Sequence, residues 1–288
     1  MEKIITLVLC LSLVLSVAGF TSKAEASEAS ATTEKAEIRQ YIETNVALLK
    51  HTFDKLPKQS TKDQIDKVIE DHYKKYPTPQ GVKNTSLNEL DVFPELEEKY
   101  KKLKDQNIKL QYSTDEELNN ILEKVYTFKK DNSTVRVLLG EIGDIQVMEH
   151  TSTPDNSTSK DASTQAVTNM ERNTVTAYAV LGGARVFNVW AEGKFQYDKK
   201  KKTVKVVHKD GDYRKFIAGS LLQIEEKKMG ESRVADQGKY VYREVYSRIY
   251  VEAILGFKFG GVVFNSGLAE VYVGAGSNGA TYGGQKKL

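Results

Sequence analysis

The chain has one cysteine in 288 residues, together with one tryptophan and five prolines. Because Cys10 lies in an apolar run near the N-terminus, the rest of the chain can form neither a disulfide nor a thiolate active site. The sequence also lacks HExxH, GxSxG and GxxxxGK[ST], the motifs of zinc peptidases, serine hydrolases and P-loop proteins. These absences exclude the motif-defined enzyme classes and require the fold to depend on burial of apolar side chains.

The N-terminus has the pattern of a secretory signal peptide. An apolar run from Ile4 to Phe20 follows Lys3, and Ala24 and Ala26 have small-x-small spacing. This predicts a signal peptide over residues 1–26 and a secreted, extracellular mature chain. An uncleaved anchor is the alternative, since about 18 apolar residues can span a membrane. The polar stretch after Ala26 favours cleavage, and Leu9 before Cys10 disfavours lipidation.

Charge divides the mature chain into two halves. The segment 151–165, beginning TSTPDNSTSKDAST, is rich in Ser, Thr, Asp and Asn and predicts an exposed linker. Residues 27–165 carry a net charge of −5, whereas residues 166–288 carry +8. One interpretation is that the acidic half shields the basic half, or is removed by proteolysis as a pro-region. The alternative is that charge merely follows the helical and strand composition of the two halves. The imbalance is too small to indicate a nucleic-acid-binding protein.

Residues 27–150 have the periodicity of short amphipathic helices. A three- and four-residue spacing predicts helical faces, and Thr61 with Gln64 forms a capping-box pattern before the second helix. Two more helices are expected, one near Asp91 and one from Thr114 through Tyr126. The segment 135–148 is ambiguous, and a strand pair bent at Gly140 or Gly143 is favoured. The first two faces contain Ile38, Ile42, Val46, Leu49, Phe53 and Leu56, then Ile65, Val68, Ile69, His72 and Tyr73.

Residues 166–288 have the alternation of antiparallel strands. In RVFNVWAEGKFQYD, residues 185–198, every second residue is apolar. The lysines after Asp198 predict one turn, and Asp210 with Gly211 predicts a two-residue hairpin turn. A last strand over 268–273 and a glycine-rich tail complete this half. The fold class expected is α+β, with a small helical region followed by an antiparallel β-sandwich or open barrel.

The segment YVYREVYSRIYVEAILGF, residues 240–257, alternates between a predicted core face and a face rich in tyrosine. Aromatic side chains with a polar tip favour half-wet interfaces such as headgroups, glycans or proteins. An external partner, a cover formed by the acidic half, and a shift of register are the three interpretations. The candidate binding face contains Trp190, Tyr240, Tyr242, Tyr246, Arg248 and Tyr250, and the candidate basic patch contains Lys199, Lys200, Lys201 and Lys202.

Evidence for catalysis or a cofactor is weak. His208, Asp210 and Asp212 have the composition of a metal site, but the same residues are typical of a hairpin tip. Three glutamates on predicted polar strand faces, Glu192, Glu244 and Glu252, would be the residues of an unrecognised hydrolase if they converged. The expectation is a non-enzymatic protein with no cofactor and no metal.

The layout resembles a family of secreted proteins. A signal peptide, the helical start TTEKAEIRQYIETNVALLK, the strand VFNVWAEGKFQYD and the tail VYVGAGSNGATYGG are similar to large bacteriocin-like proteins of bacilli, of the high-molecular-weight geobacillin type. The resemblance implies an antimicrobial protein acting without catalysis at the envelope of related Gram-positive cells. Its partner would be an anionic membrane or envelope surface. The alternative is a non-lytic module that binds cell-wall material, glycan or protein.

Overall fold

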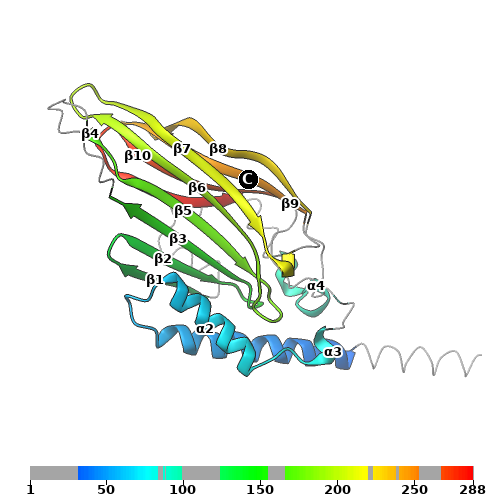
Figure 1. Cartoon of the computed structure of the whole chain (residues 1–288). Coiled ribbons are helices and arrows are strands. Elements are labelled where there is room, and N and C mark those ends of the chain that lie inside the picture. The colour runs from blue at the N-terminus through cyan, green and yellow to red at the C-terminus, as the bar shows by residue number, and fades with distance from the viewer. Residues whose placement is uncertain are drawn as a thin grey trace, which may run out of the picture.

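The computed structural model describes residues 32–83, 87, 89–98, 124–154, 166–219, 223–237, 240–252 and 267–287. The predicted signal peptide lies outside these residues, as does most of the predicted linker. Antiparallel strands dominate the described part of the chain and form two sheets, which we call sheet A and sheet B (Figure 1).

In sheet A the strands follow the order β1-β2-β3-β5-β6. The short strand β4 pairs with the end of β6, and β7 pairs with β6 along most of its length. Its strands are β1 (Lys124–Lys130), β2 (Ser133–Leu139), β3 (Ile145–Thr153), β4 (Ala166–Val167), β5 (Met170–Tyr178), β6 (Arg185–Asp198) and β7 (Thr203–Lys215). A 3-10 turn, η1 (Ile217–Gly219), follows β7. Sheet B has the order β11-β10-β9-β8 and consists of β8 (Gln223–Gln237), β9 (Tyr240–Glu252), β10 (Gly267–Gly276) and β11 (Thr281–Lys287).

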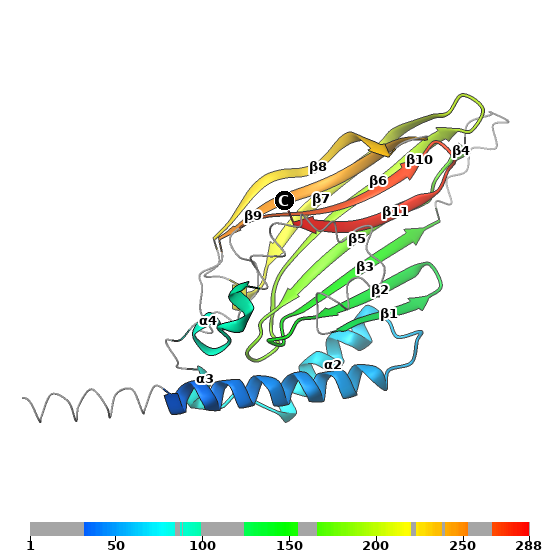
Figure 2. The same cartoon turned by 180° about the vertical axis from the view of Figure 1, so that it is seen from behind.

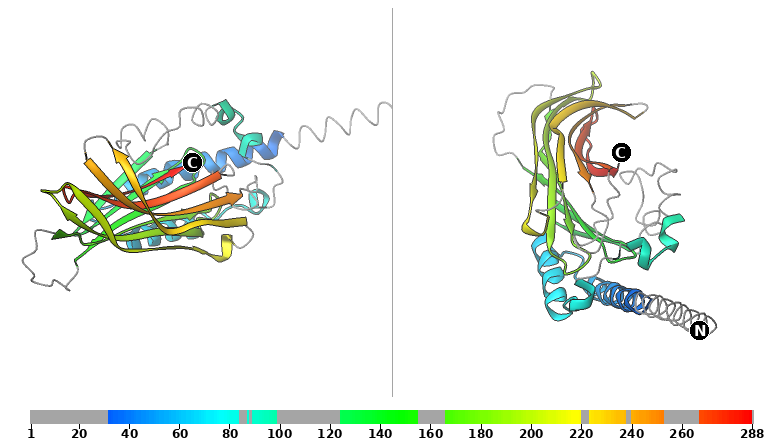
Figure 3. Two further views of the ribbon diagram at one scale, coloured as in Figure 1. Left: turned by 90° about the horizontal axis from the view of Figure 1, so that it is seen from above. Right: turned by 90° about the vertical axis from the view of Figure 1, so that its right-hand side faces the viewer.

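The two sheets pack face to face, with apolar residues of both between them (Figures 2 and 3). The alternation predicted for β6 is confirmed, because its odd-numbered residues 187, 189, 191 and 195 are buried. The inter-sheet core includes Val175, Ala177, Phe187, Val189, Ile249, Val251 and Val271, and continues through Phe195, Val204, Val245, Val273 and Ala275. The described strands form two stacked sheets and do not join into one closed barrel.

Helices cover the other face of sheet A over β1–β3 (Figure 1). A helix over residues 32–54 and α2 (Lys62–Lys75) bury the predicted apolar faces against Phe128, Val137 and Val147. The predicted capping box is confirmed, since the Thr61 N–H donates to Gln64 Oε1 at 2.9 Å and the Gln64 N–H donates to Thr61 Oγ1 at 3.4 Å. Near Asp91 the described residues include α4 (Glu89–Val92) and helical residues 95–98, and they follow α3 (Gln80–Lys83).

His72 is buried in the helical layer, where Asn45 Oδ1 lies 2.9 Å from its Nε2. Asn45 donates its amide to the Tyr41 carbonyl, so its Oδ1 accepts and His72 Nε2 carries the proton. Burial lowers the pKa of His72 to about 4, and the charge of Lys75 adds to this effect. The histidine is therefore neutral in the folded protein at neutral pH.

This burial predicts a loss of stability in mild acid. The unfolded chain takes up a proton on His72 below its ordinary pKa of about 6.5, whereas the folded protein does not until about pH 4. Stability should be full above pH 6.5 and fall by about 2 kcal/mol between pH 6.5 and 5. Urea unfolding at several pH values measures this. The His72→Gln variant, which keeps an N–H donor, should have a flatter slope, and an unchanged slope would contradict the assignment.

The acidic and basic halves share one sheet. The helix predicted from Thr114 does not extend through Tyr126, because residues 124–130 form β1. The strand pair favoured for 135–148 is confirmed as β2 and β3, and β3 continues to Thr153, inside the predicted linker. Nine residue pairs join β3 to β5. The described part of the acidic half is therefore not a separate helical unit, because β3 pairs with β5 of the basic half.

A chain cut between residues 155 and 165 should stay in one piece in native buffer. The β3–β5 ladder and the burial of Tyr178 and Val180 against the helices hold the two fragments together. An inserted protease site and size-exclusion chromatography test this, with co-elution in native buffer and separation in denaturant as the expected result. Separation without denaturant would instead support release of the acidic half as a pro-region.

The predicted hairpin at Asp210 and Gly211 is wrong, because both residues lie in the middle of β7. Instead, the absence of a side chain at Gly211 allows the two sheets to approach closely. A Cβ on Gly211 would lie 2.1 Å from Ser247 Oγ and 2.9 Å from the Gly230 nitrogen. Gly230 has φ +57°, and its N–H donates to Ser247 Oγ at 3.2 Å. Here β7 of sheet A meets β8 of sheet B backbone to backbone, which only residues without a side chain allow.

The glycine-rich tail is also more ordered than expected. The predicted last strand is confirmed as β10, but residues 281–287 form a further strand, β11, paired with it. Asn173 of β5 donates its amide to the carbonyl of Gly284 at 2.7 Å. This contact ties the tail to sheet A.

Candidate functional site

The tyrosine-rich strand β9 presents its two faces to different surroundings. Val245, Ile249 and Val251 are buried between the sheets, as the alternation predicts. Val241 is 45% exposed instead, because it lies at the end of the strand. The strand ends at Glu252, and residues 253–257 lie outside the described residues. Even-numbered residues of β9 therefore point away from sheet A.

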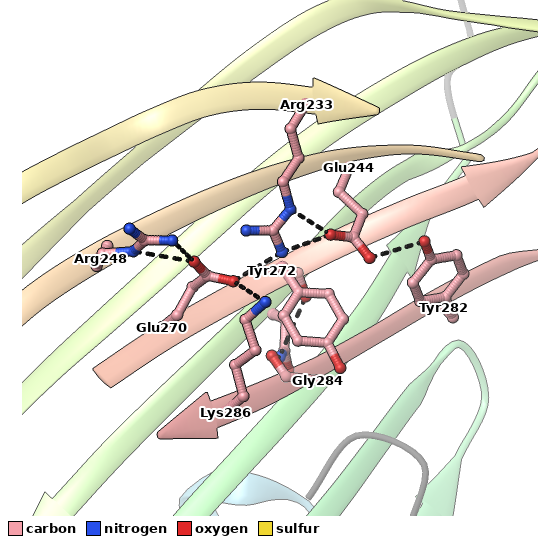
Figure 4. A network of polar contacts seen from close by, with 9 residues as sticks. Arg233, Glu244, Arg248, Glu270, Tyr272, Tyr282, Gly284 and Lys286 are labelled. Carbon is pink, nitrogen blue, oxygen red and sulfur yellow. Dashed lines mark hydrogen bonds and ion pairs between the residues drawn. The ribbon is translucent and has the colours of Figure 1, made fainter. Parts of the chain in front are cut away.

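This outer face of sheet B holds a network of charged side chains, which we call the ionic network: Arg233, Glu244, Arg248, Glu270, Tyr282 and Lys286 (Figure 4). Strand register brings them together. Glu270 lies opposite Arg248 on β9 and Lys286 on β11, while Glu244 lies opposite Arg233 on β8. Opposite charges thus meet directly across neighbouring strands.

Glu270 is the centre of the ionic network. Its side chain is 0% exposed. Arg248 donates from Nε at 3.1 Å and from Nη2 at 2.7 Å to Oε2. Oε1 is held by ion pairs with Arg233 Nη2 at 2.7 Å and Lys286 Nζ at 3.0 Å. Both oxygens of the carboxylate are therefore neutralised by cations.

Glu244 is the second buried carboxylate. Arg233 Nε donates to its Oε2 at 2.7 Å, and the Tyr282 hydroxyl donates to its Oε1 at 2.9 Å. Gly274 leaves the space that the Tyr282 ring occupies, since a Cβ on Gly274 would lie 2.4 Å from that ring. Arg233 bridges the two carboxylates, because its Nη2 also pairs with Glu270.

The electrostatics do not suit acid–base catalysis. Burial alone would raise the pKa of Glu270, but the contacts from Arg233 and Arg248 lower it below its ordinary value. Burial likewise opposes the charge of Arg233, yet its contacts with Glu270 and Glu244 raise its pKa. A carboxylate held ionised by three cations is a poor proton donor at neutral pH and a weak base. The ionic network links β8, β9, β10 and β11 and fixes the charges on the outer face of sheet B.

The tyrosines predicted as a ladder share this face but differ in their surroundings. Tyr246 lies between the guanidinium groups of Arg233 and Arg248, 4.4 and 5.5 Å from its ring centre. Tyr242 packs edge-on against Tyr282, with ring centres 5.9 Å apart. Tyr250 lies 5.6 Å from Lys227 Nζ, and Tyr240 begins β9. The ladder is thus partly built into the ionic network rather than standing free.

Trp190 does not join the tyrosines. It lies on the outer face of sheet A, opposite Thr174 and Asp212, whereas the tyrosines lie on the outer face of sheet B. The inner faces touch, since a Cβ on Gly193 would lie 2.8 Å from Val245 Cγ2. The predicted combined aromatic face is therefore two faces on opposite sides of the molecule.

The three candidate hydrolase glutamates are also separated. Glu192 lies on the outer face of sheet A, 3.4 Å from Arg172 Nη1, and Glu244 lies on the outer face of sheet B. Glu252 ends β9, and the structure does not describe its side chain. His208, Asp210 and Asp212 lie along β7, and the described residues contain no group of three metal-ligating side chains that could hold a metal ion.

The predicted basic patch lies at one end of the sandwich, which we call the basic end. Lys199, Lys200, Lys201 and Lys202 form the β6–β7 turn and are all exposed, at the upper left of Figure 1. Asp198 shapes the turn, because its Oδ1 accepts from the backbone N–H groups of Lys200 and Lys201. Gly279 of the β10–β11 turn contacts the ring of Tyr197 beside it.

Exposed valines accompany these lysines. The sandwich presents Val167, Val207, Val234 and Val241 at 46, 51, 57 and 45% exposure, on β4, β7, β8 and β9. Val167 pairs beside the end of β6, and the Ser277 N–H donates to the Val241 carbonyl at the β10–β11 turn. The basic end is therefore both cationic and apolar.

Sequence reasoning missed four of the six residues of the ionic network outright: Arg233, Glu270, Tyr282 and Lys286. The alternation of side chains along a strand could have indicated two of them. It places Glu270 on the same face as Tyr272 in residues 268–273, and Lys286 on the same face as Tyr282 in residues 282–286. Their meeting depends on the register of β10 with β9 and β11, which adjacent sequence does not specify.

Among the described residues, no helix has the length and apolar character needed to cross a membrane. No protein-family model, curated protein or solved structure matches this chain. The assignment of function therefore depends on the surfaces described above.

Proposed function

We propose that this chain is a secreted, bacteriocin-like α+β protein that acts without catalysis at the envelope of related Gram-positive cells. Residues 1–26 would direct its secretion. The basic end is the part that contacts the target, and the contact is with the anionic membrane surface. The observation that carries this proposal is the coincidence of four exposed lysines with two exposed valines, Val167 and Val241, at that end.

Charge and apolar surface play separate parts in this contact. A lysine near an anionic lipid surface contributes about 1 kcal/mol of attraction. Exposed valines gain from transfer into the acyl boundary by about 25 cal/mol for each Å² removed from water. A hydrated wall polyphosphate would attract the lysines equally but would leave the valines in water. The pairing of the two therefore favours lipid over wall polymer.

The ionic network supports a non-catalytic role. Glu244 and Glu270 are the buried carboxylates of the outer face of sheet B, and both are engaged by cations. Glu192, the other described candidate, lies on the opposite side of the molecule. The two candidate glutamates whose side chains are described, Glu192 and Glu244, therefore do not lie together as a carboxylate pair.

The test compares binding and leakage with vesicles containing phosphatidylglycerol and vesicles of phosphatidylcholine alone. Replacing Lys199, Lys200 and Lys201 with Gln and Lys202 with Asn should weaken binding to the anionic vesicles by two to three orders of magnitude, from about 1 kcal/mol per lysine. Asparagine suits position 202 because its φ is +54°. The same variant should lose killing of related bacilli.

A matched control removes the same charge from the helical layer, with Lys55, Lys67, Lys74 and Lys75 replaced by Gln. Those lysines are also exposed, so equal losses would mean that only net charge matters and would contradict a specific basic end. Replacing Val167 and Val241 with Thr should weaken vesicle binding without changing binding to purified teichoic acid. Equal binding of wild type and the lysine variant to anionic vesicles would exclude the proposal.

A further inference from the structure

The outer face of sheet A across β5, β6 and β7 is an ordered polar surface centred on Trp190. Strand register places three rows side by side: Thr176, Asn188 and Arg214; Thr174, Trp190 and Asp212; Arg172, Glu192 and Asp210. The helices lie mainly against β1–β3 (Figure 1), and α2 reaches this side of β5 and β6 through Asp66, which accepts from the Tyr178 hydroxyl and pairs with Arg185 Nη1 at 3.8 Å. The face is separate from the basic end and from the ionic network.

Three adjacent polar atoms on this face are shielded from solvent and lack a hydrogen-bond partner within the described chain. They are Trp190 Nε1, Asn188 Oδ1 and Thr176 Oγ1. Thr176 is 1% exposed and lies directly opposite Asn188 on β6. Asn188 is in turn two residues from Trp190 along the same strand. A buried polar group without a partner costs about 1–3 kcal/mol, and such groups are uncommon in folded proteins. The set combines a donor, an acceptor and a hydroxyl.

Arg172 covers the indole. Its guanidinium carbon lies 4.9 Å from the centre of the Trp190 ring, and its ion pair with Glu192 is long, with 3.4 Å between Nη1 and Oε2. The Arg172 side chain is 40% exposed, so moving it from the indole breaks only a weak contact. Its displacement would uncover an apolar ring face flanked by hydrogen-bonding groups.

The charges on this face come close to balancing. Two cations, Arg172 and Arg214, share the face with three anions, Glu192, Asp210 and Asp212. A surface of this kind does not favour a strongly charged ligand. Carboxylates, an amide and guanidinium groups beside an aromatic ring match a ligand with many hydroxyls and one apolar face. A hydroxyl both donates and accepts, which is what the unpartnered donor and acceptor require.

We propose that this face binds an uncharged pyranose unit of a glycan chain, with the sugar ring stacked on Trp190 in place of Arg172. Hydroxyls of the sugar would bond to Asn188 Oδ1, Trp190 Nε1 and the Asp212 carboxylate. The site stands independently of the basic end, because it uses a different surface and a different ligand chemistry.

Trp190 is the only tryptophan in the chain, so its fluorescence reports on this face alone. Titration of the full chain with the tetramer of β-1,4-linked N-acetylglucosamine and with cellotetraose should change the emission saturably for at least one of them. Calorimetry under the same conditions should give a matching Kd. No binding of either probe by both methods overturns the proposal. Tighter binding of dextran sulfate than of both neutral probes overturns the assignment to an uncharged ligand.

Variants separate this site from the tyrosine-bearing face. Asn188→Ala and Asp212→Ala should each weaken oligosaccharide binding at least tenfold, with unchanged far-UV circular dichroism. Tyr250→Ala, on the outer face of sheet B, is the matched control and should bind as wild type. Loss of binding in Tyr250→Ala, with retention in Asp212→Ala, would place the glycan on the other sheet and contradict the proposal. Vesicle binding should be unchanged in all three variants.

Discussion

Replacing Gly211 with valine should destabilise the protein more than any other single substitution considered. The added side chain would meet the backbone carbonyl oxygen of Trp190 and the backbone nitrogen of Gly230, as well as Ser247 Oγ. Backbone atoms of two paired strands cannot move aside as a flexible side chain can. The sheets would have to separate at this point, and we expect a loss of about 3–5 kcal/mol.

Thermal and urea unfolding of Gly211→Val measure this loss, with Gly81→Ala as the matched control. Gly81 lies in α3, and a Cβ there would meet nothing within 4 Å. Because alanine favours helix over glycine by up to about 1 kcal/mol, the control should be neutral or slightly stabilised. A Gly211→Val protein as stable as Gly81→Ala would mean that β7 and β8 are not in backbone contact.

Replacing Glu270 with alanine should have the second largest effect. The substitution removes the only carboxylate that contacts Arg248 and Lys286 in the ionic network and leaves three cations close together in a partly buried site. Loss of one partner from a buried ion pair typically costs about 3–5 kcal/mol, since the remaining charges stay desolvated. The urea midpoint should fall accordingly.

The matched control for Glu270→Ala is Glu70→Ala, which breaks an exposed pair with Lys74 on α2. Its effect should stay below about 1 kcal/mol, as for other exposed pairs. Adding Arg248→Met to Glu270→Ala should recover part of the lost stability, because one uncompensated charge is removed. If Glu270→Ala and Glu70→Ala were equally mild, the ionic network would contribute no more than a surface pair.

Local patterns predicted the elements whose shape depends on their own residues. The helix over 32–54, the capping box of α2 and the alternation of β6 all follow from spacings within one segment. The turn of four lysines between β6 and β7 was predicted in the same way. Periodic burial of apolar side chains is enough to define such elements.

The errors occurred where a distant segment decides the local structure. Asp210 and Gly211 have the composition of a hairpin turn, but contact with Gly230 keeps them in an extended strand. Residues 281–287 are rich in glycine, yet pairing with β10 makes them a strand. Trp190 and the tyrosines fit one pattern of amphipathic alternation, but they belong to different sheets.

The helical and strand periodicities, the absence of cysteine beyond position 10 and the opposite charges of the two halves can be read directly from the residues. The pairing of distant strands was needed to place the two halves in one sheet, to bury Glu244 and Glu270 among cations, and to put Trp190 on a different sheet from the tyrosines of β9. The reason is physical. A residue's own segment determines which side of a strand it occupies, whereas the pairing and stacking of strands distant in sequence determine what that side meets.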